Sequence, residues 1–200
     1  MKIYFDGDSF TKGTELFKQK DTRFSRLICD ALGAEEYNIA VSSCSNHAIV
    51  RRLILENNIS DFDYAVIQMA LPMRGEYYDG QRYRFLRPNS QQGRGEFKKW
   101  LWYYYQNIYH DKYGNDDECI LYHTIKNHCE VNNVPVIILT NRTFGTWQAK
   151  NKGKYRVLNS LVQFDLNLEH YPKAPWRGHP DEEGHKMIAE DILSLLTKHK

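Results

Sequence analysis

The chain has 200 residues, a length that fits one domain with a sizeable hydrophobic core. Hydrophobic residues make up 42% and charged residues 26%, which is ordinary for a soluble globular protein, and no apolar run approaches the roughly 20 residues of a membrane span. The net charge of +2 is too small to argue for or against a charged partner.

The sequence predicts alternating strands and helices. Strands are expected at residues 2–6, 37–41, 64–69 and 134–139, with a further short strand near 161–166. Helices are expected at 22–32 (with Asp21 as N-cap and Gly33 as its stop), 46–57, 96–109, 116–131 and from Asp181 to about 197. Residues 72–95 read as an irregular insertion, and Arg51 and Arg52 are expected on a solvated helix face.

Strands that are apolar on both faces and separated by amphipathic helices predict a parallel sheet. We therefore expect a single three-layer α/β/α domain over residues 1–200, with a sheet of about five strands and a flavodoxin-like architecture. Ligands of such folds bind at the carboxyl ends of the strands. Residues 7–13, 42–47, 70–75 and 140–146 should meet at this rim.

The stretch KIYFDGDSFTKG (2–13) ends the first strand in a polar turn that fits two chemistries. In one, Ser9 is a nucleophile, and a histidine must act as its base. His179 is the candidate, because it precedes Pro180 on the loop that enters the last helix, which Asp181 can cap. In the other chemistry, Asp6 attacks phosphorus, Asp8 transfers the proton and both bind Mg²⁺.

The sequence resembles the SGNH (GDSL-type) hydrolases in three blocks: GDSFTKG (7–13), NIAVSSCSNHAIVRR (38–52) and GHPDEEGHKMIAEDI (178–192). The resemblance implies an esterase or O-deacetylase that forms an acyl-enzyme without a metal or organic cofactor. It makes Ser9 the nucleophile, His179 the general base and Asp8 a support of the turn. The backbone N–H groups of Ser9 and Ser43 would donate to the oxyanion, with Ser42 as the alternative to Ser43.

The chain departs from the family pattern at two places. Leu71 stands where the family has an asparagine donor; the substitutes considered are Asn46, Arg74 and Asn141. Arg177 and Trp176 stand where the family has the aspartate that orients the histidine, so a Ser–His dyad oriented by a backbone carbonyl is expected.

Two other functions stay open. The departures fit a non-catalytic binding module on the same fold, for a glycan or a nucleic acid. FDGDSFT also resembles the first motif of haloacid-dehalogenase-like phosphatases, which implies a Mg²⁺ enzyme using Asp6 and Asp8, although no later acidic pair follows a strand.

The Arg- and Tyr-rich stretch RYRFLRPNSQQGRGEFKKWLWYYYQ (82–106) could contact substrate, with Arg74 beside it, or bind single-stranded nucleic acid. The preferred partner is a small-molecule or carbohydrate ester, without a membrane. The four cysteines form no C-x-x-C pair and no basic-then-apolar segment begins the chain, so we expect reduced thiols and a cytoplasmic protein.

Overall fold

The computed structural model describes residues 1–17, 19–88, 95–140, 165–167 and 179–198. Five parallel strands form one sheet in the order β2-β1-β3-β6-β7. Their bounds are Lys2–Asp6 (β1), Glu35–Asn38 (β2), Tyr64–Gln68 (β3), Val136–Thr140 (β6) and Asp165–Asn167 (β7). The order begins at one edge with β2 and places β1 beside β3, so the turn after β1 lies next to the end of β3.

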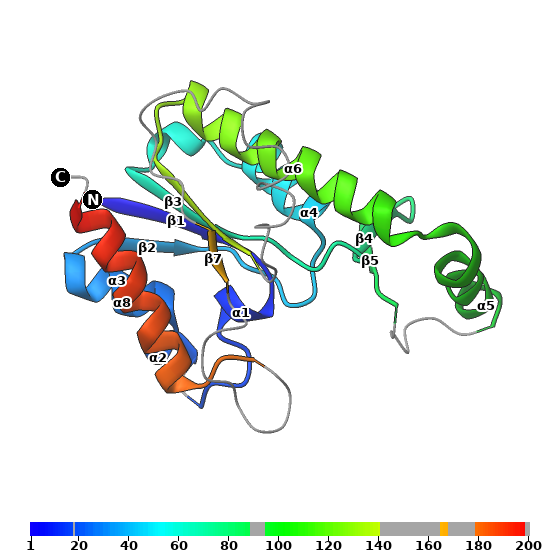
Figure 1. Cartoon of the computed structure of the whole chain (residues 1–200), viewed down its shortest axis with the longest axis horizontal. Coiled ribbons are helices and arrows are strands. Elements are labelled where there is room, and N and C mark those ends of the chain that lie inside the picture. Colours follow the sequence, from blue (N-terminus) through cyan, green and yellow to red (C-terminus); the bar gives the residue numbers. More distant parts are fainter. Residues whose placement is uncertain (18, 89–94, 141–164, 168–178, 199–200) are drawn as a thin grey trace.

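Helices cover both faces of this sheet (Figure 1). Those of the described chain are α1 (Ser9–Lys12), α2 (Gln19–Thr22), α3 (Phe24–Leu32), α4 (Asn46–Arg51), α5 (Glu96–Tyr103), α6 (Asp111–Val131) and α8 (Glu182–Lys198), with short π- or 3₁₀-helical turns η1 (Arg52–Glu56), η2 (Ile59–Asp61) and η3 (Tyr104–Ile108). In the figure α4 and α6 lie on one side of the sheet and α3 and α8 on the other. The predicted three-layer arrangement is confirmed.

Each face of the sheet has its own hydrophobic core. Tyr4, Ala65 and Ile138 belong to the core beneath α4 and α6, whereas Phe5, Val66 and Leu139 belong to the core beneath α3 and α8. Successive strand residues point to opposite faces, so β1, β3 and β6 need apolar side chains at nearly every position. This is the pattern that made these strands readable in the sequence.

Several boundaries differ from the sequence prediction. β2 begins two residues earlier than expected, and α6 begins at Asp111 rather than at 116. Asp21 lies within α2 and does not cap α3, although Gly33 ends that helix in the left-handed conformation as expected. The stretch 141–164, with the start of the short predicted strand, lies outside the described residues.

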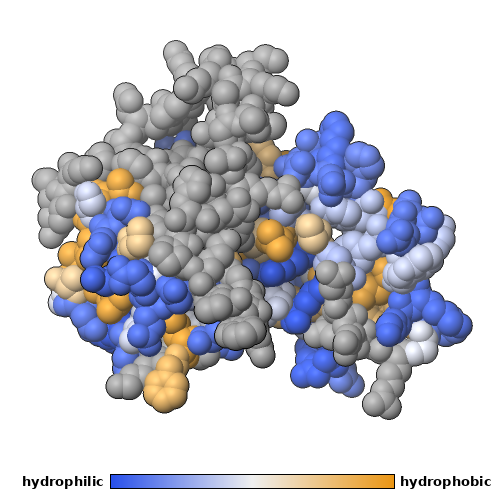
Figure 2. Space-filling model, turned by 60° about the horizontal axis from the view of Figure 1, so that its bottom comes forward, coloured by the Kyte–Doolittle hydropathy of each residue, from blue (hydrophilic) through white to orange (hydrophobic). Residues whose placement is uncertain are grey.

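The segment predicted as irregular contains a β-hairpin, β4 (Gly75–Tyr78) paired with β5 (Tyr83–Leu86). The aromatic residues of both strands favour β-structure, but the neighbouring glycines, prolines and arginines indicated an irregular loop in the sequence. Together with α5 and η3 the hairpin forms a projection from the sheet body, which we call the arm (described residues 72–88 and 95–110; Figures 1 and 2).

The arm is poorly buried. Leu101 is the buried residue of α5, whereas Trp100, Trp102 and Tyr103 are exposed. Hydrophilic and hydrophobic side chains are interspersed over this lobe (Figure 2). No helix in the described part of the chain is both long and apolar enough to cross a membrane.

Candidate active site

The turn after β1 is held by the neighbouring strand. Oε1 of Gln68, the last residue of β3, accepts hydrogen bonds from the Asp8 N–H (3.2 Å), the Thr11 N–H (3.2 Å) and the Thr11 hydroxyl (3.0 Å). A Cβ atom on Gly7 would lie 2.6 Å from Thr11 Oγ1 and 2.8 Å from Gln68 Cβ. Glycine is therefore required for the turn to approach β3 so closely.

Ser9 is the first residue of α1, and its hydroxyl faces a histidine from the other end of the chain. Oγ lies 2.8 Å from His179 Nε2, although the two residues are 170 positions apart. Asp181 accepts a hydrogen bond from the Gly184 N–H, which caps α8 and fixes the end of the loop that carries His179. The structure thus brings together the two residues on which the serine hypothesis depends.

The second ring nitrogen of His179 faces Glu15. Nδ1 lies 3.0 Å from Oε2 of this carboxylate, within ion-pair range but without the angle of a hydrogen bond. The Phe10 ring packs edge-on against the imidazole, with ring centroids 5.2 Å apart. A side-chain carboxylate therefore lies beside Nδ1, where the sequence analysis expected a backbone carbonyl.

The sequence analysis missed Glu15, because it searched for the carboxylate just before the histidine. Arg177 and Trp176, the residues at that position, lie outside the described part of the chain. Glu15 follows the first helix by a few residues and has a φ of 81°, an uncommon value for a glutamate. Its place on the loop after the Ser9 turn is the signal that could have identified it.

The second loop, residues 39–45 between β2 and α4, packs against the same turn. Ser43 has a φ of 63°, so this serine adopts the left-handed conformation for which glycine is best suited. Ser42 Oγ lies 2.8 Å from Thr14 Oγ1, and the Cys44 thiol donates to the Gly7 carbonyl oxygen at 3.1 Å. Burial raises the pKa of Cys44 to about 12, which leaves it protonated and a poor nucleophile at neutral pH.

The Asn46 side chain, considered above as a substitute oxyanion donor, binds the backbone of Ala70. Its amide nitrogen donates to the Ala70 carbonyl oxygen at 3.0 Å, and its amide oxygen accepts from the Ala70 N–H at 2.6 Å. The side chain thus anchors the segment after β3 through one amide N–H and its amide oxygen. Asn141, another candidate, lies outside the described residues.

The two aspartates of the turn are bound by different arginines. Asp6 is fully buried and accepts two hydrogen bonds from Arg52, at 3.0 and 2.6 Å, one from the Gly7 N–H and one from the Tyr4 hydroxyl. We call Asp6 and Arg52 the floor pair. The Arg52 side chain is therefore buried against Asp6, and the prediction that it lies on a solvated helix face was wrong.

Asp8 caps α1 through the Phe10 N–H at 3.0 Å, and its other carboxylate oxygen accepts a hydrogen bond from Arg74. We call Asp8 and Arg74 the rim pair. In the phosphatase hypothesis both carboxylates share one metal ion, but here each is taken up by a separate guanidinium group. The described residues contain no cluster of three or more metal-ligating side chains. This geometry does not favour the phosphatase alternative.

His185 lies six residues after His179 but is fully buried. Its Nδ1 accepts the Phe24 N–H at 3.1 Å, and its ring stacks on that of Phe24. Burial lowers the pKa of His185 to about 4, so the ring is neutral in the folded protein. This histidine contributes to the core, not to the rim.

No protein-family model and no curated protein matches the sequence. Solved structures do match. The chain is similar over its whole length to a carbohydrate esterase whose active site has divergent catalytic and non-catalytic binding functions, with a TM-score of 0.59 and 16% identity. It spans 65% of the length of that protein.

Two further structures match over nearly the whole of both chains. TesA superimposes with a TM-score of 0.61 at 11% identity and 100% coverage of each chain. A protein of the G-D-S-L family from Desulfitobacterium hafniense superimposes with a TM-score of 0.56 at 12% identity, covering 97% of this chain and 98% of its own. The chain has the fold of the SGNH/GDSL hydrolases, and the resemblance found in the sequence is confirmed at that level.

Proposed function

We propose that the protein is a serine hydrolase of the SGNH type, an esterase or O-deacetylase that works through an acyl-enzyme. The observation that carries this proposal is the 2.8 Å contact between Ser9 Oγ and His179 Nε2. A serine hydroxyl is a weak nucleophile unless a base within hydrogen-bond reach accepts its proton. His179 is within that reach.

In the proposed reaction, Ser9 Oγ attacks the ester carbonyl carbon while His179 Nε2 takes the hydroxyl proton. The imidazolium then returns this proton to the leaving alcohol, and the acyl group stays on Ser9. Water attacks the acyl-enzyme with His179 again as base, which releases the acid and restores the serine.

Glu15 acts as a positioning residue in this proposal. A carboxylate beside Nδ1 stabilises the imidazolium that forms during each proton transfer, and it favours the ring orientation that directs Nε2 at Ser9. The 3.0 Å separation between Oε2 and Nδ1 supports this role. The pair expected from the sequence thus becomes a Ser–His–Glu arrangement.

The oxyanion would be bound by the backbone N–H groups of Ser9 and Ser43. The left-handed φ of Ser43 supports this assignment, because it gives the serine the backbone conformation expected of a glycine at this position. Asp8 supports the turn as its cap. Leu71 offers no side-chain donor, so the third donor of the family pattern is missing from its usual position.

The substrate class we propose is a small-molecule or carbohydrate ester. A carbohydrate esterase among the similar structures supports the second of these. Arg74 binds Asp8 next to Ser9, which supports the prediction that this arginine contacts substrate.

The decisive experiment is the intact mass of the protein after incubation with a fluorophosphonate probe. We expect one adduct on the wild type and none on Ser9→Ala, with Ser42→Ala as a matched control that is still labelled. His179→Ala should lower ester turnover by about 10²–10⁴-fold.

Absence of an adduct from the folded wild type would contradict the proposal. The non-catalytic binding module would then be preferred, and it would be tested by binding of acetylated oligosaccharides to the unmodified protein. Phosphate release that depends on Mg²⁺ and survives Ser9→Ala would instead support the aspartate chemistry.

A further inference from the structure

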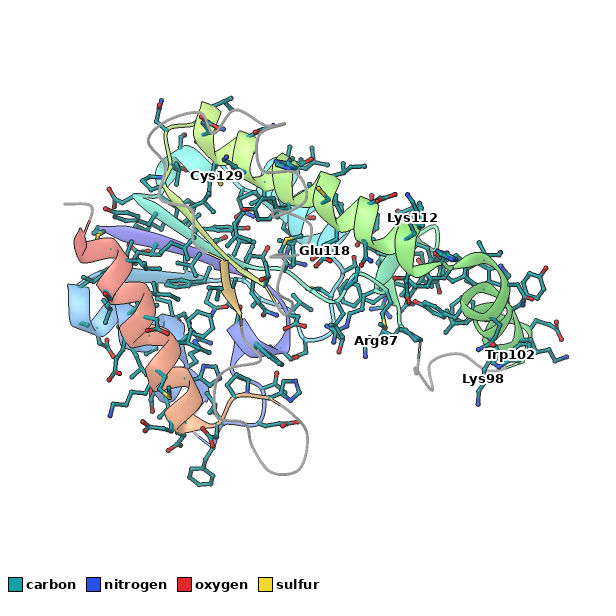
Figure 3. The ribbon with its side chains drawn as sticks, in the orientation of Figure 1. Arg87, Lys98, Trp102, Lys112, Glu118 and Cys129 are labelled. Atoms are coloured by element: carbon teal, nitrogen blue, oxygen red, sulfur yellow. The ribbon has the colours of Figure 1, made fainter. Side chains whose placement is uncertain are left out.

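Two arginines lie side by side at the end of the β4–β5 hairpin that is nearest the sheet. The strands pair with Gly75 opposite Leu86, so Arg74, which precedes Gly75, and Arg87, which follows Leu86, lie just beyond this pair. Arg87 lies between the sheet body and α5, at the root of the arm (Figure 3). Like charges at facing positions of a hairpin are destabilising unless something compensates them.

One of the two guanidinium groups has a carboxylate partner. Arg74 donates to Asp8, the residue next to Ser9. Glu76, the nearest acidic residue of β4, is occupied by two hydrogen bonds of 3.2 Å from Arg51. The hairpin therefore supplies no free carboxylate for Arg87.

Arg87 itself is unpaired among the described residues. The Arg87 Nε atom is buried without a hydrogen-bond acceptor. The guanidinium carbon lies 6.0 Å from the centroid of the Phe85 ring. Burial and the positive charge of Arg74 lower the pKa of Arg87, but a guanidinium group remains protonated at any physiological pH. An uncompensated, partly buried charge of this kind is costly, and such charges are normally paired.

We propose that Arg87, together with Arg74, binds an anionic oxygen group (a carboxylate, sulfate or phosphate) carried by the ester substrate. A guanidinium group suits these anions because its parallel N–H donors match two of their oxygens. The contact of Arg74 with Asp8 connects this subsite to the Ser9 turn, so the anion lies on the same side as the reacting ester. The inference rests on the proposed hydrolase function and specifies its substrate as acidic.

The test compares matched pairs of esters. The acyl part carries the charge in 4-nitrophenyl hydrogen succinate and lacks it in methyl 4-nitrophenyl succinate. The alcohol part carries it in 3-acetoxybenzoate and lacks it in methyl 3-acetoxybenzoate. In at least one pair we expect kcat/KM to favour the acid by about tenfold or more, the usual effect of one charged hydrogen bond.

In Arg87→Gln the kcat/KM values for the acid and its methyl ester should differ by no more than about threefold. Arg82→Gln is the matched control, because it removes the same charge from an exposed position of the same hairpin and should keep the preference. The inference would be overturned if the wild type had equal kcat/KM values for the acid and the methyl ester in both pairs. A preference for the acid that Arg87→Gln does not change would also overturn it.

A binding measurement separates this inference from the proposed function. Calorimetric titration of Ser9→Ala with 3-acetoxybenzoate and with monomethyl succinate should show binding that Arg87→Gln weakens about tenfold. Such binding, together with the absence of a fluorophosphonate adduct on the wild type, would keep the anion subsite and reject the hydrolase. An adduct on the wild type without binding of either acid would keep the hydrolase and reject the subsite.

Discussion

The floor pair and the rim pair begin two residues apart in the sequence but belong to different environments. Asp6 and Arg52 are closed off from solvent, and every polar atom of the Asp6 carboxylate is engaged by the protein. Asp8 is also buried, but the side chain of its partner Arg74 is 18% exposed and adjoins Arg87, which has no acidic partner in the part of the chain that the structure describes. The carboxylate of the floor pair is fully hydrogen-bonded within the protein. Beside the rim pair, by contrast, the described residues leave the positive charge of Arg87 without an anionic partner, and a ligand could supply one.

The largest effect is expected at the floor. Arg52→Met should lower the free energy of unfolding by about 3–5 kcal/mol, because it leaves the Asp6 carboxylate buried without a countercharge. Urea denaturation followed by far-UV circular dichroism measures this. Burial raises the pKa of Asp6 and Arg52 opposes that rise, so the variant should also be least destabilised at acidic pH.

Arg74→Met is the matched comparison at the rim. We expect a loss of only about 1 kcal/mol, because Asp8 keeps its cap on α1 and Arg74 is partly solvated. Equal losses for the two variants would remove the distinction between floor and rim.

A buried histidine on α8, His185, makes stability depend on pH. His185 has a pKa lowered to about 4 by burial, against an ordinary value of 6.5. Between these values the unfolded chain binds a proton that the folded chain does not, so stability falls as pH falls from 6.5 to 4. The loss from this group is on the order of 3 kcal/mol.

Histidine ¹³C NMR of the wild type follows this titration directly, and His185→Gln should show a smaller decline in stability over the same pH range. A His185 signal that titrates near 6.5 in the folded protein would contradict the prediction.

At the rim, Glu15→Gln should reduce activity with little effect on folding. We expect kcat to fall by on the order of 10–100-fold at nearly constant KM, because in the proposed reaction the carboxylate stabilises the imidazolium that forms in the transition state. The rate of fluorophosphonate labelling should fall in parallel, and Glu15→Asp should recover part of it. A change in KM alone, or in the melting temperature alone, would assign Glu15 a merely structural role.

The smallest effect is expected at the second loop. Ser43→Gly should raise the free energy of unfolding by about 1 kcal/mol, because glycine adopts the left-handed conformation without a steric penalty. Thermal unfolding measures this, with Ser42→Gly as a control expected to be neutral or destabilising. A destabilised Ser43→Gly would show that the serine side chain contributes more than its backbone strain removes.

Sequence reasoning succeeded where a pattern is local. β1, β3 and β6 were readable because burial on both faces demands continuous apolar runs. Ser9 and His179, which the structure places 2.8 Å apart, could be selected as candidates because each lies in a short motif at an element boundary. Glu15 and the Asp6–Arg52 pair were missed because nothing in a linear sequence encodes which charged side chains meet across the fold. The hairpin was missed because β-pairing outweighed the local preference of glycine-rich sequence for turns.

The hydrogen bonds of Gln68 make the turn that carries Ser9 dependent on the register of the strands. Gln68 belongs to β3, and its side-chain oxygen accepts three donors from the turn after β1. A slip of one residue between these strands would move every side chain of β3 to the opposite face, and all three acceptor contacts would be lost together. A misregistered sheet therefore cannot hold the turn that carries Ser9 as this structure does, so correct placement of Ser9 depends on correct assembly of the sheet.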